Sequence, residues 1–125
     1  MKPMLLVLLA AAACSSDEGT PPAIADFTFN PMTIAVGQPT AVTCAATFTD
    51  PDGDLSQLGA EITLPGGQTQ AVPMIDLPVA GNTQGTLNFA LALNPPVAGS
   101  YPFEIWVTDE AGNVSNRLSG TLTAQ

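Results

Sequence analysis

The chain has 125 residues, a formal net charge of −9 and no histidine. Its only cations are Lys2 and Arg117, set against eleven carboxylates, so a phosphate backbone would be repelled and nucleic-acid binding is not expected. Without histidine, and with Lys2 in a segment expected to be removed, a Ser-His-Asp triad, a Schiff-base lysine and a phosphate-binding P-loop are excluded. Composition therefore argues against an enzyme, and zinc and copper sites lose their usual ligand.

Residues 1–13 have the layout of a secretory signal peptide. Lys2 supplies the positive charge, Met4 to Leu9 is an unbroken apolar run, and Ala10 to Ala13 provides small residues for cleavage. The apolar run is much shorter than the ~20 residues that span a bilayer as a helix, so a transmembrane segment is not expected.

The residues around Cys14 resemble the lipobox of bacterial lipoproteins, because small residues precede Cys14 and a short polar stretch follows it. The resemblance implies that Cys14 is lipidated and anchors the chain to the membrane of the cell envelope. Ser15 favours the outer membrane in that family. The family usually has Leu where Ala11 stands, so ordinary cleavage after Ala13 stays open. Residues 14–22 are predicted to form the lipidated polar tether.

The remaining segment, residues 23–125, has the pattern of short strands separated by Gly, Pro, Asn and Asp turns, with no helical period. Residues 73–84 have no clear pattern. Seven strands in about a hundred residues predict one all-β domain, an immunoglobulin-like β-sandwich with Greek-key connections. The expected strands are Ile24 to Phe29, Thr40 to Thr49, Leu58 to Leu64, Thr69 to Val72, Thr86 to Leu93, Tyr101 to Thr108 and Arg117 to Thr123.

Three stretches resemble bacterial Ig-like, PKD-like and cadherin-like domains. Residues 47–54, TFTDPDGD, resemble the region from strand B to strand C, and residues 107–116, VTDEAGNVSN, resemble the F–G hairpin. Residues 98–103, AGSYPF, resemble the approach to strand F, which implies that Tyr101 forms a tyrosine corner. The resemblance is to a fold that serves many functions, so it does not by itself assign one.

Cys44 is the second of two cysteines, and two cysteines in an exported protein could form a disulfide. If Cys14 carries lipid, Cys44 has no partner, and its alternation with Val42 and Phe48 then predicts a small buried hydrophobic residue. The Ig-like resemblance implies that Cys44 and Phe103 occupy the positions of the inter-sheet cysteines of antibody domains. Because Phe103 cannot form a disulfide, the sheets are expected to be joined by packing.

Two acidic loops are expected to meet, because the B–C and F–G loops of an Ig-like sandwich lie at the same end. Alternating carboxylates in a tight loop are hard oxygen ligands that suit calcium. The alternative is that Asp, Asn and Gly are present only because turns require them. The candidate calcium ligands are Asp50, Asp52, Asp54, Asp109 and Asn113.

Trp106 is the only tryptophan, and alternation predicts that it points outward beside Glu104. The two residues are candidate contacts for a sugar or a protein, or else a neighbouring residue covers the indole. Paired carboxylates at a convex end, without an apolar cleft, do not fit a glycosidase.

We therefore expect a non-catalytic, membrane-anchored module with a structural or protein-interaction role. The alternative is a carbohydrate-binding or adhesive module that calcium stabilises. The expected partner is accordingly either a protein or a glycan.

Overall fold

The computed structural model describes residues 19–125, so the predicted signal peptide and Cys14 lie outside the described residues. None of the described residues forms a helix, and this part of the chain accordingly has no helix able to span a membrane. The strands are β1 (Ala23–Asn30), β2 (Thr33–Ile34), β3 (Thr40–Thr49), β4 (Leu55–Thr63), β5 (Thr69–Asp76), β6 (Gln84–Leu93), β7 (Gly99–Asp109) and β8 (Leu118–Ala124).

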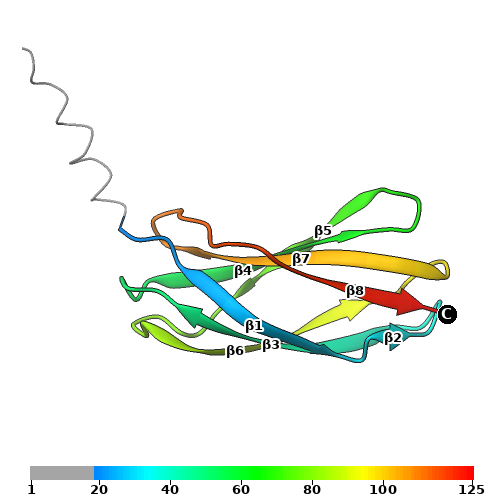
Figure 1. Cartoon of the computed structure of the whole chain (residues 1–125), viewed down its shortest axis with the longest axis horizontal. Coiled ribbons are helices and arrows are strands. Elements are labelled where there is room, and N and C mark those ends of the chain that lie inside the picture. The colour runs from blue at the N-terminus through cyan, green and yellow to red at the C-terminus, as the bar shows by residue number, and fades with distance from the viewer. Residues whose placement is uncertain (1–18) are drawn as a thin grey trace, which may run out of the picture.

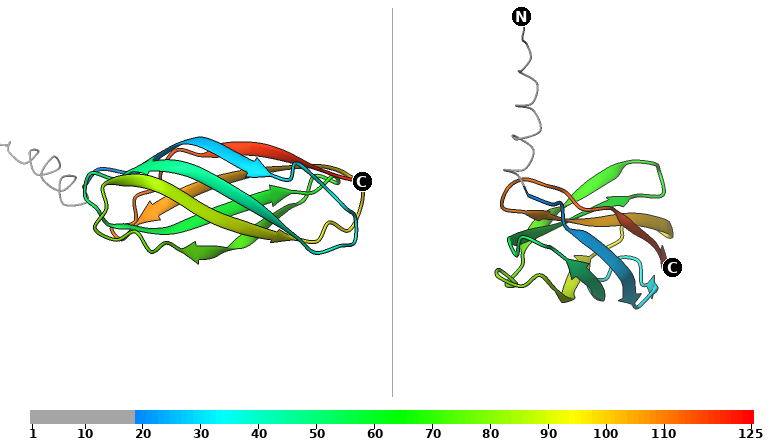
Figure 2. Two further views of the ribbon diagram at one scale, coloured as in Figure 1. Left: turned by 90° about the horizontal axis from the view of Figure 1, so that it is seen from below. Right: turned by 60° about the vertical axis from the view of Figure 1, so that its left-hand side comes forward.

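Two sheets pack face to face (Figures 1 and 2). One has the strand order β1-β3-β6, and the other has the order β2-β8-β7-β4-β5. The chain crosses between the sheets after β1, β2, β3, β5 and β6, which confirms the predicted Ig-like sandwich. The first described residues and the C-terminus lie at opposite ends of the long axis (Figure 1).

The seven predicted strands all form. The strand Thr40–Thr49 has the predicted bounds, the other six have different bounds, and the described part of the chain contains one further strand. The additional strand, β2, follows Pro31 and pairs in parallel with β8, so the start of the domain contributes to both sheets. Two residues are too few to show an alternating pattern, which is why the sequence did not predict β2. Strand β5 extends to Asp76, beyond its predicted end, and includes Pro73. Proline is tolerated there because β5 is an edge strand.

Aromatic side chains fill much of the space between the sheets. The ring of Phe103 lies edge-on to Phe27 and Phe29, with centroid distances of 5.7 and 5.1 Å. The Tyr101 hydroxyl donates a hydrogen bond to the Val97 carbonyl at 2.6 Å, which confirms the tyrosine corner. Cys44 and Phe103 are both buried, on β3 and β7 of opposite sheets. Packing between the sheets therefore occupies the place that a disulfide holds in antibody domains.

Cys44 is 1% exposed and forms no disulfide, as predicted. Burial raises the pKa of its thiol to about 11.

We expect thiol reagents to label native Cys44 slowly, because the reactive thiolate is scarce at neutral pH. Cys44→Ser should lower the free energy of unfolding by roughly 1–3 kcal/mol, since it places a hydroxyl in an apolar site. Labelling kinetics and thermal melting measure the two effects, with Cys44→Ala as the control without the hydroxyl. Labelling of the native chain as fast as of the unfolded chain would contradict the burial.

Candidate metal centre at the acidic end

The structure brings four aspartates together at the end where β3 and β7 terminate. Asp50, Asp52 and Asp54 belong to the loop between β3 and β4, and Asp109 is the last residue of β7. One carboxylate oxygen of each aspartate lies within 4.8 Å of the others. The two acidic loops therefore meet, as the sandwich topology predicted.

Backbone hydrogen bonds set the shape of the β3–β4 loop. The Asp50 amide donates to the Thr83 carbonyl at 2.7 Å and extends the pairing of β3 with the chain before β6. The Gly53 amide donates to the Asp50 carbonyl at 2.9 Å, which closes the turn, and φ of Gly53 is +67°, a conformation that favours glycine. The Glu110 amide donates to the Asp54 carbonyl at 3.0 Å and joins this loop to the loop after β7.

Two carboxylate oxygens in the cluster are buried without a hydrogen-bond partner among the described residues: Oδ1 of Asp50 and Oδ1 of Asp54. Asp50 is fully buried, and its other oxygen, Oδ2, accepts a hydrogen bond from the Asp54 amide at 2.9 Å. A buried carboxylate oxygen without a partner destabilises the folded state, because the charge loses its hydration and no hydrogen bond replaces it.

The cluster also lacks a compensating side-chain charge. Arg117, the only cation in the described part of the chain, is ion-paired with Glu104 at 3.2 Å instead. Burial, and then the charges of Asp109 and Asp50, raise the pKa of Asp54 above its ordinary value. A bound cation would relieve both the repulsion and the unsatisfied oxygens.

Asn113, the fifth predicted ligand, lies beside Asp109. Its backbone amide donates to Oδ1 of Asp109 at 2.8 Å, and its side-chain amide donates to Oδ2 at 3.0 Å. These two bonds hold the Asp109 carboxylate at the end of β7. The structure thus gives Asn113 a positioning role, and its coordination of a metal stays a prediction.

Thr20, one of the first described residues, also reaches the cluster. Its amide donates to Oδ2 of Asp52 at 2.7 Å, although 32 residues separate the two in sequence. Asp52 is exposed, so this contact lies at the rim of the cluster. The sequence predicted a tether over these residues and carried no signal for its contact with the acidic loop.

The chemistry of the cluster suits a hard divalent cation. Four carboxylates supply oxygen ligands, which calcium prefers, and the flexible geometry of calcium tolerates an irregular set. Calcium takes 6–8 oxygens, so backbone carbonyls or water would complete its shell. The arrangement of the four carboxylates is therefore one that could hold a metal ion.

The second predicted site lies on the outer face of the five-stranded sheet. The guanidinium of Arg117 sits 4.1 Å from the centre of the Trp106 ring and is ion-paired with Glu104. The indole also packs directly on Gly59, its cross-strand partner, where a Cβ would lie 2.6 Å from the ring. Trp106 is half-buried, so the structure favours the expectation that neighbouring residues cover the indole.

No protein-family model matches the chain, and no curated protein resembles it in sequence. Among solved structures, the chain is similar to the PKD domain of an M14-like peptidase from a Thermoplasmatales archaeon. The sequence identity is 20% and the TM-score 0.52, over 84% of this chain and 96% of that one. It is also similar to the sporulation control protein Spo0M of Bacillus subtilis, with 8% identity and a TM-score of 0.51, over 85% of this chain and 50% of that one.

A further similar structure is a CARDB domain from Pyrococcus furiosus, described in complex with di-metal ions. Its identity is 12% and its TM-score 0.49, over 83% of this chain and 94% of that one. At these identities the likenesses show the fold alone. Together with the strand order, the likeness to the PKD domain shows an all-β sandwich of the immunoglobulin-like class.

Proposed function

We propose that this chain is a cell-envelope lipoprotein, anchored to the membrane through Cys14, whose Ig-like domain is a non-catalytic structural or protein-interaction module. The observation that carries the module is the strand order of an Ig-like sandwich, and the contact of Thr20 with Asp52 at 2.7 Å indicates where the predicted tether meets it. This contact lies at the acidic end, so the chain leading from the predicted anchor joins the domain there. The opposite end, where the chain terminates, would then face away from the membrane (Figure 1).

Calcium is proposed to stabilise the membrane-proximal end of this module. The cluster joins the β3–β4 loop, the end of β7 and, through Asp52, the last residues of the tether. An ion bound there would neutralise repulsion among these segments and hold the tether in one orientation relative to the sandwich. A spacer that presents its far end to a partner needs such rigidity at its base.

Replacing the lipidated cysteine tests the anchor. Wild type is expected in the membrane fraction, at the density of the outer membrane, and Cys14→Ala in the soluble fraction. The control is Cys44→Ala, which should leave the protein in the membrane fraction. Intact mass should show a mature chain that starts at Cys14 and carries acyl chains. A soluble mature protein with a free thiol at Cys14 would overturn the anchor.

The alternative function, sugar binding through Trp106 and Glu104, requires the stacking face of the indole to be free. Arg117 lies over that ring and pairs with Glu104, so a sugar would have to displace it. A glycan array tests this alternative directly. Binding that is specific in wild type and lost in Trp106→Ala would favour it, and the matched variant Arg117→Gln should then bind more tightly because the ring is uncovered.

A further inference from the structure

One edge of the sandwich differs from the other three in being long and unprotected. The edges are β1 and β6 in one sheet and β2 and β5 in the other. Strand β1 is interrupted by a register shift next to Asp26, whose φ is +53°, and β5 contains Pro73 and a register shift. Strand β2 has only two residues. Charges, prolines, bulges and short lengths are the devices that keep edges from pairing with other chains.

Strand β6 has none of these devices. Its ten residues, QGTLNFALAL, include no charge and no proline, and its pairing with β3 runs from Gln84 to Leu93 without a register shift. In an antiparallel pair the backbone groups of successive residues point alternately toward the partner strand and away from it. The Asp50 amide bonds to the Thr83 carbonyl, so Thr83 points toward β3. By this alternation, the backbone N–H and C=O groups of Gln84, Thr86, Asn88, Ala90 and Ala92 point outward.

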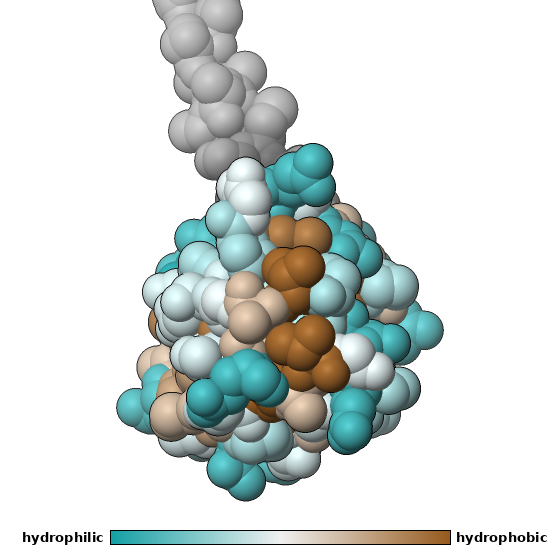
Figure 3. All heavy atoms as spheres, turned by 90° about the vertical axis from the view of Figure 1, so that its right-hand side faces the viewer, coloured by the Kyte–Doolittle hydropathy of each residue, from teal (hydrophilic) through white to brown (hydrophobic). Residues whose placement is uncertain are grey.

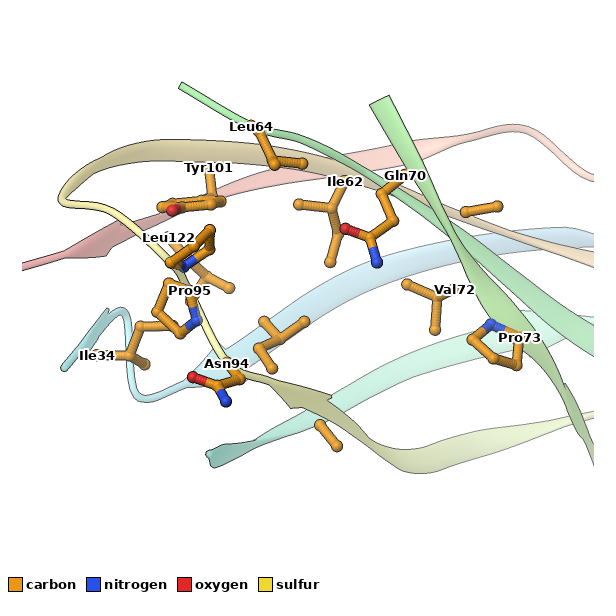
Figure 4. Close-up of a pocket in the computed structure, with 14 residues that line it drawn as sticks. Ile34, Ile62, Leu64, Gln70, Val72, Pro73, Asn94, Pro95, Tyr101 and Leu122 are labelled. Carbon is orange, nitrogen blue, oxygen red and sulfur yellow. The ribbon is translucent and has the colours of Figure 1, made fainter. Parts of the chain in front are cut away.

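A cavity of about 350 Å³ lies beside the end of this edge, between β6 and β5 (Figure 4). No charged side chain lines it. Its walls are largely aliphatic, and its polar side chains are Gln70, Asn94 and Tyr101 (Figure 4). Apolar residues also gather on the end of the molecule that faces away from the acidic cluster (Figure 3). The main lining residues are Ile34, Ile62, Leu64, Val72, Leu93 and Pro95.

We propose that the outer edge of β6 accepts an extended strand from a partner protein, which adds a fourth strand to the β1-β3-β6 sheet. The outward backbone groups of β6 are complementary to the backbone of such a strand, and this is the reason for naming a polypeptide as the ligand. Every second side chain of the added strand points into the space between the sheets. Next to Leu93 that space is the cavity, which takes an aliphatic side chain.

Charge specifies the partner strand further. The added strand is uncharged where it runs beside β6, and it carries a basic residue at the end that approaches the exposed Asp52, near the start of β6. The inference deepens the proposed interaction role and rests on it.

A second copy of this chain fits the edge less well. If two β6 strands paired, the inward side chains of each, Leu87, Phe89 and Leu91, would stay in the core of their own copy, where they are buried. They could not enter the cavity of the other copy. A strand that is extended and unpaired before binding can supply those side chains.

Phage-displayed peptides of random sequence, selected on the whole chain, test the proposal. We expect enrichment of peptides with aliphatic residues at alternate positions and a basic residue at one end. Bound peptide should slow hydrogen exchange at the outward amides of Thr86, Asn88 and Ala90, and it should leave the exchange of Leu87 and Phe89 little changed. Absence of enrichment, or protection of amides elsewhere, would overturn the proposal.

Ala90→Pro tests the edge itself, because proline removes one outward N–H and leaves the bonds to β3 in place. The enriched peptides should bind this variant at least about tenfold more weakly, and should bind Ala90→Ser about as well as wild type. Val72→Phe, which fills the cavity, should weaken the binding of peptides with aliphatic residues by a similar factor. Retention of the circular dichroism spectrum shows that each variant is folded.

Equal binding to Ala90→Pro and wild type would overturn strand addition. A peptide-free dimer of wild type that Ala90→Pro dissociates would assign the edge to a second copy, and that result also overturns the proposal. Neither result affects the membrane fractionation of Cys14→Ala, so failure of this inference is distinguishable from failure of the proposed anchor.

Discussion

Calcium is expected to raise the melting temperature of this protein by roughly 6–20 °C when it is present at tenfold to hundredfold excess over its dissociation constant. Binding to the folded state alone adds about 1.4–2.7 kcal/mol at that excess, and about 1 kcal/mol shifts the melting of a domain this size by 4–8 °C. The physical reason is that buried oxygens of Asp50 and Asp54 have no partner among the described residues, and an ion would supply one. The dissociation constant should lie near 10⁻⁴–10⁻³ M, the range typical of extracellular calcium-binding modules.

Melting with calcium, magnesium or a chelator at constant ionic strength measures this effect. Magnesium should shift the melting less, because it demands near-octahedral geometry. Asp52→Asn should reduce the calcium shift, whereas Glu61→Gln, which removes a carboxylate outside the cluster, should leave it unchanged. If magnesium raises the melting temperature as much as calcium does, or if Asp52→Asn leaves the calcium shift unchanged, the loops are ordinary turns.

The calcium-free protein should carry a pH signature of the same cluster. Because the pKa of Asp54 is raised in the folded state, the folded state holds this proton at pH values where the unfolded chain has lost it. The contribution of Asp54 to stability is therefore full below its ordinary pKa and is lost as the pH rises through the raised pKa. In chelator, Asp54→Asn should gain melting temperature relative to wild type as the pH is raised from about 4 to 7. If the difference in melting temperature between Asp54→Asn and wild type does not change with pH, the raised pKa of Asp54 is contradicted.

Gly120→Val is expected to be the most damaging single change in the core, with a loss of about 3 kcal/mol or more in the free energy of unfolding. Gly120 is the cross-strand partner of Phe103 on β8. A Cβ at this position would lie 2.7 Å from the Phe29 ring and 2.9 Å from the Phe103 ring. The aromatic cluster that joins the two sheets can exist only because this residue has no side chain.

Urea unfolding of Gly120→Ala and Gly120→Val measures that constraint. The alanine variant should lose about 1–2 kcal/mol and the valine variant more, because overpacking forces both rings from their positions. Gly66→Ala is the matched control: a Cβ there meets nothing within 4 Å, so its effect should stay within about 0.5 kcal/mol. Equal losses at positions 66 and 120 would show that backbone entropy, and not ring packing, governs both.

Much of the fold could be predicted from local pattern. Alternating apolar residues predicted the strands around Cys44 and Phe103, and turn residues predicted the acidic loop that follows each of these strands. The convergence of Asp50 with Asp109 followed from topology alone, because the sandwich places those loops at one end. The eighth strand, β2, was missed because a pair of residues has no periodicity, and its strand identity depends on pairing with β8.

The sequence by itself determined the fold class, the acidic character and the oxygen-rich set of candidate ligands, because alternation, turn chemistry and charge are properties of neighbouring residues. Only the tertiary structure decided which oxygens lack partners, that Thr20 reaches Asp52, and that Arg117 covers Trp106. It also decided that β6 is left as the open edge. Desolvation, stacking and strand pairing join residues far apart in the chain, and no local pattern records which distant group will occupy a given position.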